Sequence, residues 1–281
     1  MRRAYGDDSY WIHRYEQRAS SSGAASSADN EATDEWLFSY PNLKPLLKIR
    51  SGASLVDLGC GTSMLTLDAV ADLGDGSRAV GADIAPAAIE YQLSEQRARA
   101  ARGCSGSMQA SFVCKDICRS DAWEAESSSF DVCIDKATTD GLLCDTKRGA
   151  ARVRSMYAAI APALRPEALV AVLSWRSPER DGVEWCIDCV LGGLREGSVA
   201  CEDDDDHDIS SSRWTLDVHS IVREVKEEED GEALDADQGP HVYLLRRRPR
   251  RRSRRRIAVA QRLEEDGSDE LEMRHHVHTV S

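Results

Sequence analysis

The chain has 281 residues, 41% of them hydrophobic and 30% charged, which is typical of a globular protein. Its net charge of −13 argues against a surface that binds nucleic acid throughout, because neutralising phosphates requires clustered Lys and Arg. No apolar stretch approaches the roughly 18 residues of a spanning helix, and the amino terminus lacks the apolar core of a secretory signal. We therefore expect no membrane partner and a cytoplasmic location, with the nucleus and the mitochondrion as alternatives.

Residues 1–50 are predicted to form an aromatic segment interrupted by a flexible linker. Ser20 to Asn30 are small and polar with no apolar period. The flanking sequences, YWIHRY and DEWLFSYPNLKPLLKIR, concentrate Trp and Tyr, and the second predicts a helix from about Pro41 to Ser51.

From Ser54 the sequence alternates between strand and helix patterns, which predicts βαβ units and a parallel sheet. Strands are expected at 54–59, 78–84, 111–117, 130–136 and 168–175, and helices at 61–73, 86–101 and 151–164. An acidic insertion follows at about 196–212. Residues 213–225 and 241–247 are expected to close the sheet as an antiparallel pair.

This order predicts a Rossmann-like α/β domain over residues 51–248. Its sheet should have seven strands, mostly parallel with an antiparallel last strand, and helices on both faces. Residues 249–281 are predicted to form a disordered charged tail.

The strongest local motif is LVDLGCGTSML, in which a buried strand is followed by a glycine-rich turn that opens a helix. Gly59 and Gly61 permit a tight turn and the close approach of a nucleotide-like ligand. A dinucleotide site would have a third glycine where Met64 stands, which disfavours an oxidoreductase. Asp57, on the strand itself, either contacts the ligand or braces the loop.

Two further acids follow the next two strands of the predicted sheet. Asp83 ends the second strand, where a carboxylate can accept both hydroxyls of a ribose. Asp116 ends the third strand and can accept from an adenine amino group, while Ile117 packs on the ring. Because the carboxyl ends of parallel strands form the ligand crevice, these acids and the glycine turn point to one nucleoside site.

Four phrases, DLGCGTSML, VGADIAP, CKDIC and FDVCIDKATTDGLL, resemble class I S-adenosylmethionine methyltransferases. The segment from Asp135 to Leu143 is similar to the D/E-K-G-T-x-D-A-L motif of the methyltransferase-like 13 group. That group includes elongation factor 1A lysine methyltransferases and the citrate synthase lysine methyltransferase. The chain departs from it at Thr62, Ala137 and Pro166-Glu167-Ala168.

The resemblance implies that S-adenosylmethionine is the cofactor. It implies that Trp11, Tyr15 and Trp36 cover the cofactor, although Trp11 and Trp36 can also be read as core anchors. It further implies that the site is lined by Gly59, Asp83, Ile84, Asp116, Ile117 and Lys136.

The resemblance also implies a protein-lysine N-methyltransferase, with elongation factor 1A as one candidate partner. A lysine amine must lose a proton before it can accept a methyl group. Asp135 and Asp140 follow the fourth strand, so either could orient the amine or relay its proton. Two alternatives remain: a small-molecule methyltransferase of the same fold, and a degenerate domain that binds partners through its tail.

Nine arginines lie between Arg246 and Arg256, where the domain joins the tail, and this is the one segment through which nucleic acid binding is considered. Cys186 and Cys189 form a lone CxxC, and three histidines lie near the carboxyl terminus (His275, His276 and His278). Neither pattern has the second pair or the carboxylates of a metal site, so no metal is predicted.

Overall fold

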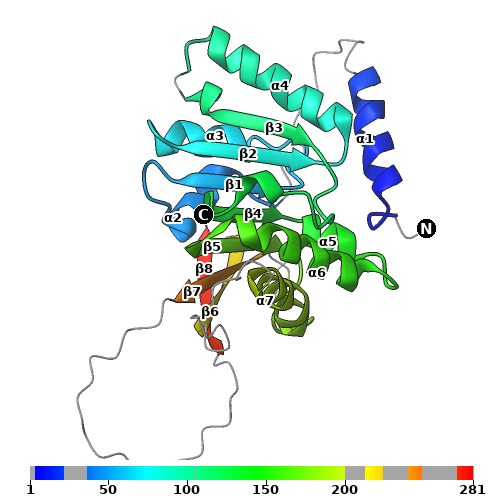
Figure 1. Ribbon diagram of the computed structural model, residues 1–281, viewed down its shortest axis with the longest axis vertical. Helices are drawn as coiled ribbons and strands as arrows, with labels where there is room; N and C mark the ends of the chain where they lie inside the picture. The colour runs from blue at the N-terminus through cyan, green and yellow to red at the C-terminus, as the bar shows by residue number, and fades with distance from the viewer. Residues whose placement is uncertain are drawn as a thin grey trace, which may run out of the picture.

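The computed structural model describes residues 4–21, 37–104, 106–199, 213–223, 240–248 and 271–280. Its centre is an eight-stranded sheet in the order β3-β2-β1-β4-β5-β7-β6-β8 (Figure 1). The strands are β1 (Ser54–Leu58), β2 (Arg78–Asp83), β3 (Ala110–Cys114), β4 (Phe130–Lys136), β5 (Leu164–Ser174), β6 (Arg213–Arg223), β7 (His241–Arg248) and β8 (Leu271–Val280).

Helices precede and connect these strands. They are α1 (Asp8–Ser21), α2 (Tyr40–Leu47), α3 (Leu65–Leu73), α4 (Pro86–Ala101), α5 (Thr138–Leu143), α6 (Gly149–Ile160) and α7 (Gly192–Val199). A π-helical segment (Cys186–Leu191) runs into α7, and short 3-10 segments lie at Ser107–Gln109, Glu124–Glu126 and Ala161–Ala163.

The predicted architecture is confirmed for the first seven strands. Neighbours from β3 through β5 pair in parallel, and β7 runs antiparallel to both β5 and β6. The strand order reverses at β1, which lies between β2 and β4. In such sheets the reversal opens a ligand crevice at the carboxyl ends of the strands.

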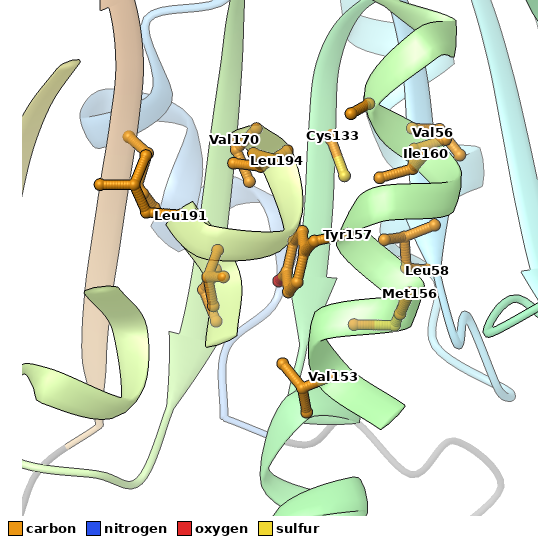
Figure 2. Close-up of a cluster of buried hydrophobic side chains, with 14 of the residues drawn as sticks. Val56, Leu58, Cys133, Val153, Met156, Tyr157, Ile160, Val170, Leu191 and Leu194 are labelled. Atoms are coloured by element: carbon orange, nitrogen blue, oxygen red, sulfur yellow. The ribbon is translucent and has the colours of Figure 1, made fainter. Parts of the chain in front are cut away.

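Side chains that alternate along each strand divide the core into two layers. Val56, Cys133 and Val170 point to the face that α6 and α7 cover, where they pack with residues such as Tyr157 and Leu194 (Figure 2). The intervening residues of the same strands, including Leu55, Ile134 and Ala171, face the layer formed with α2 and α3. This alternation decides on which side of the sheet each strand's polar residue lies.

Two predicted boundaries are corrected by the structure. Residues 271–280 were predicted to be disordered, but they form β8, which pairs in parallel with β6. The physical reason is that β6 would otherwise present unpaired backbone groups along the sheet edge. The acidic insertion was predicted to begin at Glu196, which instead belongs to α7 and forms an ion pair with Arg154 (2.6 Å).

The structure also bears on the membrane-spanning, metal-binding, cysteine and arginine patterns of the sequence. Among the described residues, no helix combines the length and apolar character that crossing a bilayer requires. The same residues contain no group of three or more His, Cys, Asp or Glu placed to hold a metal ion. Cys186 and Cys189 are buried free thiols of the π-helical segment. Most of the arginine run, from residue 249 on, lies outside the described ranges.

Candidate functional site

A cavity of about 430 Å³ opens at the carboxyl ends of the parallel strands. This volume falls within the range of about 300–1,000 Å³ typical of small-molecule sites. Each of the strands β1 to β5 contributes residues at or just beyond its end. These are Gly59 to Ser63 after β1, Asp83 and Ile84 at β2, Asp116 to Cys118 after β3, Lys136 to Thr138 at β4, and Trp175 and Arg176 after β5.

The glycine turn after β1 adopts the backbone conformation that its composition predicts. Gly59 and Gly61 have φ angles of 70° and 50°, a region that residues with side chains rarely adopt. A Cβ at Gly61 would lie 2.4 Å from the Tyr15 hydroxyl, so only glycine fits beneath α1. Gln92 of α4 supports the turn, donating from Nε2 to the carbonyl oxygens of Gly61 (2.9 Å) and Ser63 (2.6 Å).

Asp83 links this turn to the beginning of α4. Its Oδ2 accepts a hydrogen bond from the backbone N–H of Gly61 (2.9 Å), and its Oδ1 accepts one from Ala85 (2.9 Å). Burial raises the pKa of the carboxyl group, while these hydrogen bonds act in the opposite direction. Asp83 therefore shapes the cavity as well as lining it.

Helix α1 forms the aromatic wall of the cavity. The Trp11 indole donates to the carbonyl oxygen of Tyr5 (2.8 Å) and stacks with the Tyr15 ring at a centroid distance of 6.3 Å. The helix is tied to α6 by an ion pair between Asp8 and Arg152 (2.6 Å). Trp36, predicted to join this wall, lies outside the described residues.

Two of the predicted acids do not line the cavity. The buried Asp57 faces α3, where its Oδ2 accepts from the Thr66 hydroxyl (2.8 Å), which matches the loop-bracing role. The buried Asp135 faces α6 and α5 instead, and it accepts from Tyr157 (2.7 Å) and from the Thr139 hydroxyl (2.5 Å). The prediction that Asp135 is a catalytic candidate is therefore wrong, because its carboxylate anchors two helices and has no access to the cavity.

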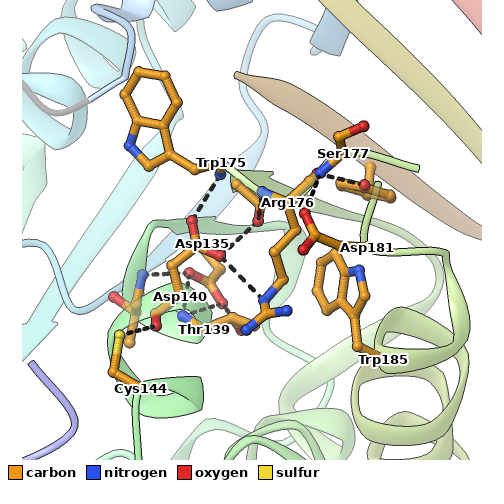
Figure 3. Close-up of polar contacts among 12 residues, drawn as sticks. Asp135, Thr139, Asp140, Cys144, Trp175, Arg176, Ser177, Asp181 and Trp185 are labelled. Carbon is orange, nitrogen blue, oxygen red and sulfur yellow. Dashed lines mark hydrogen bonds and ion pairs between the residues drawn. The ribbon is translucent and has the colours of Figure 1, made fainter. Parts of the chain in front are cut away.

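Asp140 of α5, by contrast, lines the cavity, and Figure 3 shows its contacts. Its Oδ1 accepts from the Ser174 hydroxyl (2.5 Å), and its Oδ2 accepts from the backbone N–H of Trp175 (2.8 Å). Burial raises the pKa of this carboxyl group to about 6, and the charge of Asp135 adds to the increase. Asp140 is thus an ionisable group that changes charge near neutral pH at the cavity wall.

The predicted site residues are therefore mostly brought together. The cavity is lined by Trp11, Tyr15, Gly59, Gly61, Asp83, Ile84, Asp116, Ile117, Lys136 and Asp140. Sequence reasoning did not select Trp175, Arg152 or Thr62 as site residues, although all three line the same cavity. The position of Trp175 directly after β5 places it at the ligand edge of the sheet, but its exposure into the cavity is known only from the structure.

The residues that line the cavity have the chemistry to bind a nucleoside that carries a polar group. Thr62 is 6% exposed, and its hydroxyl has no hydrogen-bond partner among the described residues. A buried hydroxyl in a cavity wall without a partner is satisfied when a polar ligand binds there. Asp83 and Asp116 supply acceptors at neighbouring strand ends, while Ile84 and Ile117 supply apolar surface.

Comparisons with known proteins agree with this architecture. Residues 49–180 match the profile of a family described as a methyltransferase domain. The mitochondrial citrate synthase-lysine N-methyltransferase of Danio rerio is 28% identical over 188 residues, covering 59% of this chain and 73% of that protein. The crystal structure of a predicted O-methyltransferase from Agrobacterium tumefaciens has a TM-score of 0.51 at 11% identity, covering 86% of this chain and 88% of that chain. The similarity to the Agrobacterium tumefaciens structure, at this low sequence identity, shows that the two proteins share a fold.

Substitution of Thr62 by Val tests the ligand-facing role of its hydroxyl. We expect S-adenosylhomocysteine, the demethylated form of the predicted cofactor, to bind about three- to tenfold more weakly, as for one lost hydrogen bond. Thermal stability should not fall, because the hydroxyl has no partner among the described residues. Calorimetric titration and thermal unfolding measure the two effects.

Thr66→Val is the matched control, since it removes a hydroxyl of the same type that donates to Asp57. It should lower the free energy of unfolding by about 1–3 kcal/mol and change the affinity less than Thr62→Val. Unchanged affinity in Thr62→Val would show that this hydroxyl does not contact the ligand.

Loss of the Tyr157 hydroxyl tests the structural assignment of Asp135. In Tyr157→Phe the buried carboxylate loses one donor, which should cost about 1–3 kcal/mol of unfolding free energy. The dissociation constant of S-adenosylhomocysteine should stay within about twofold, a change below about 0.5 kcal/mol, because neither Tyr157 nor Asp135 lines the cavity. Chemical denaturation and calorimetry provide the data, and unchanged stability would refute an anchoring role.

Proposed function

We propose that this chain, a class I S-adenosylmethionine-dependent methyltransferase, methylates a lysine side chain of another protein. The observation that carries the choice of an amine acceptor is Asp140, a largely buried carboxylate whose side chain is 17% exposed and lines the cavity. The relative from Danio rerio, whose name describes a lysine N-methyltransferase, supports a protein substrate. Elongation factor 1A is one candidate partner within this proposal.

The cofactor, when bound, supplies a methyl group on a positively charged sulfur. The residues that would hold it are those of the strand ends, with Gly61 allowing close approach, Asp83 and Asp116 accepting hydrogen bonds, and Thr62 offering its hydroxyl. The aromatic faces of Trp11 and Tyr15 suit a cation and exclude water from that part of the cavity.

Asp140 can accept a hydrogen bond from an amine without giving up its present partners. A carboxylate has about four lone-pair sites, and the Ser174 hydroxyl and the Trp175 N–H occupy two of them. These two donors also fix the orientation of the carboxylate. An ionised carboxylate attracts an amine and repels the carboxylate of an acidic metabolite, which favours a nitrogen acceptor.

The ionised carboxylate of Asp140 stabilises a protonated amine, so other groups near it must favour the uncharged amine that transfer requires. A free lysine amine has a pKa near 10.4 and is almost fully protonated at neutral pH. The guanidinium of Arg176, whose Nε lies 3.9 Å from Asp140 Oδ1, places a positive charge next to the acceptor position. Nearby positive charge and burial both lower the pKa of an amine. Asp140 would then hold the amine while its proton leaves to solvent.

The direct experiment is methyl transfer from labelled S-adenosylmethionine to two separate pools. Purified full-length chain is incubated with a protein extract and, in parallel, with the small-molecule fraction of the same cells. We expect label in protein, with mass spectrometry locating it on lysine. Label that appears only in the small-molecule fraction would show that the acceptor is a metabolite.

The pH dependence of kcat/KM tests the role of Asp140. Below pH 6 both the enzyme carboxylate and the acceptor amine are protonated, so the logarithm of kcat/KM should rise with pH at a slope of two. Above pH 6 only the amine remains to be deprotonated, and the slope should fall to one. Asp140→Asn should lower kcat/KM by about 10²-fold and show a slope of one throughout.

The matched control for this prediction is Asp121→Asn, an exposed carboxylate that pairs with Arg119 and does not line the cavity. It should retain the two-slope profile and the rate of the unmodified chain. If Asp140→Asn also retains the change of slope near pH 6, another group is responsible for it.

A further inference from the structure

We infer that Trp175 determines acceptor specificity by packing its indole ring against the alkyl chain of the acceptor amine. This inference rests on the proposed function, because it assigns the residue that selects a lysine-like chain at the same cavity. It follows from the exposure of Trp175, from the way its backbone is held, and from its position relative to Asp140.

The side chain of Trp175 is exposed in the wall of the cavity, where a bound ligand could contact it. Its side chain is 47% exposed and lines the cavity. The other large hydrophobic residues exposed in the described ranges are Leu93 and Met108, and neither lines the cavity. A single exposed apolar side chain is ordinary, but an exposed indole in a cavity wall offers a large apolar face that a ligand can bury.

The backbone of Trp175 is held on both sides by charged side chains. Its N–H donates to Asp140 Oδ2 (2.8 Å), and its carbonyl oxygen accepts from the guanidinium of Arg180 (2.8 Å). Arg180 itself forms an ion pair with Asp181 (2.8 Å). Figure 3 shows the indole ring of Trp175 projecting away from Asp140, which accepts the hydrogen bond from its backbone N–H. The ring is therefore presented from a constrained position, which lowers the entropy lost on binding.

Trp175 and Asp140 form one recognition unit through their shared hydrogen bond. The carboxylate recognises a nitrogen, and the indole recognises apolar surface or a cation over its face. A ligand that contacts both groups has an apolar chain that ends in an amine. The lysine side chain has this chemistry, whereas a short amine would reach the carboxylate without covering the indole.

Gly141, the residue after Asp140 in α5, lies next to the ring of Trp11. A Cβ added at Gly141 would be 3.6 Å from the Trp11 ring, so a side chain there would narrow the space beside that indole. α5 thus places its carboxylate next to Trp175 and its glycine next to Trp11. α5 therefore contacts both tryptophans, Trp11, which the proposed function assigns to the cofactor, and Trp175, which this inference assigns to the acceptor.

The test measures binding of two small probes to the full chain saturated with S-adenosylhomocysteine. Nα-acetyl-lysine methylamide carries the alkyl chain and the amine, and Nα-acetyl-norleucine methylamide carries a similar chain without the nitrogen. Ligand-observed NMR gives both dissociation constants. We expect Trp175→Ala to weaken both probes by about tenfold or more, and Asp140→Asn to weaken only the lysine probe.

Controls separate this role from general damage to the protein. Calorimetric titration should give the same affinity for S-adenosylhomocysteine in Trp175→Ala as in the unmodified chain. Met108→Ala, which removes an exposed apolar side chain outside the cavity, should leave both probes unaffected. If Trp175→Ala loses cofactor binding through misfolding, Trp175→Leu retains apolar bulk and should still weaken the lysine probe.

Equal binding of the lysine probe by the unmodified chain and the Trp175 variants would overturn the inference, as would failure of the unmodified chain to bind it. Neither result bears on the proposed function if labelled methyl groups still appear on protein lysines. Conversely, label confined to metabolites would refute the proposed function whatever the probes show. The two claims can therefore fail separately.

Discussion

The carboxylate of Asp83 joins the two turns that create the cavity floor. One oxygen holds the N–H of Gly61 in the glycine turn, and the other holds the N–H of Ala85 at the beginning of α4. The glycine turn follows β1, where the strand order reverses, and the second turn follows the neighbouring strand β2, so Asp83 fixes the relative positions of two segments that line the crevice. Burying a carboxylate is costly, and the hydrogen bonds from the backbone offset part of that cost. The position of the glycine turn, and of α1 above it, depends on this arrangement.

The two aspartates of the segment after β4 differ in function because they face different surroundings. Asp135 is still within the strand, so its side chain follows the alternation of β4 and points to the α6 layer. Asp140 lies five residues further on, in the first turn of α5, and contacts the end of β5 through Ser174 and Trp175. Burial raises the pKa of both carboxyl groups, but only the second can meet a ligand.

Much of the fold could be predicted because its signals are local. The apolar run of β4 and the proline that begins α4 gave bounds identical to those observed, Phe130–Lys136 and Pro86–Ala101. The strand β8 could not be predicted, because its formation depends on the free edge of β6, which lies far away in the sequence. The charge of the surrounding tail concealed the strand pattern of residues 271–280.

The candidate site was predictable where a residue type follows a strand end, as for Gly61, Asp83 and Asp116. Sequence alone could not separate Asp135 from Asp140, since Tyr157 and Ser174, their partners, are remote in the chain. It also could not assign Trp175, because a tryptophan that ends an apolar strand has the same sequence pattern whether it is buried or exposed. Its exposure follows only from the packing around β5.

Binding of S-adenosylmethionine in the cavity at the strand ends can be measured by calorimetric titration of the full chain with S-adenosylhomocysteine and, separately, with a nicotinamide dinucleotide. We expect one-to-one binding of S-adenosylhomocysteine with a dissociation constant on the order of micromolar, and no measurable heat from the dinucleotide. Binding of the dinucleotide, or no binding of S-adenosylhomocysteine by well-folded protein, would contradict this expectation.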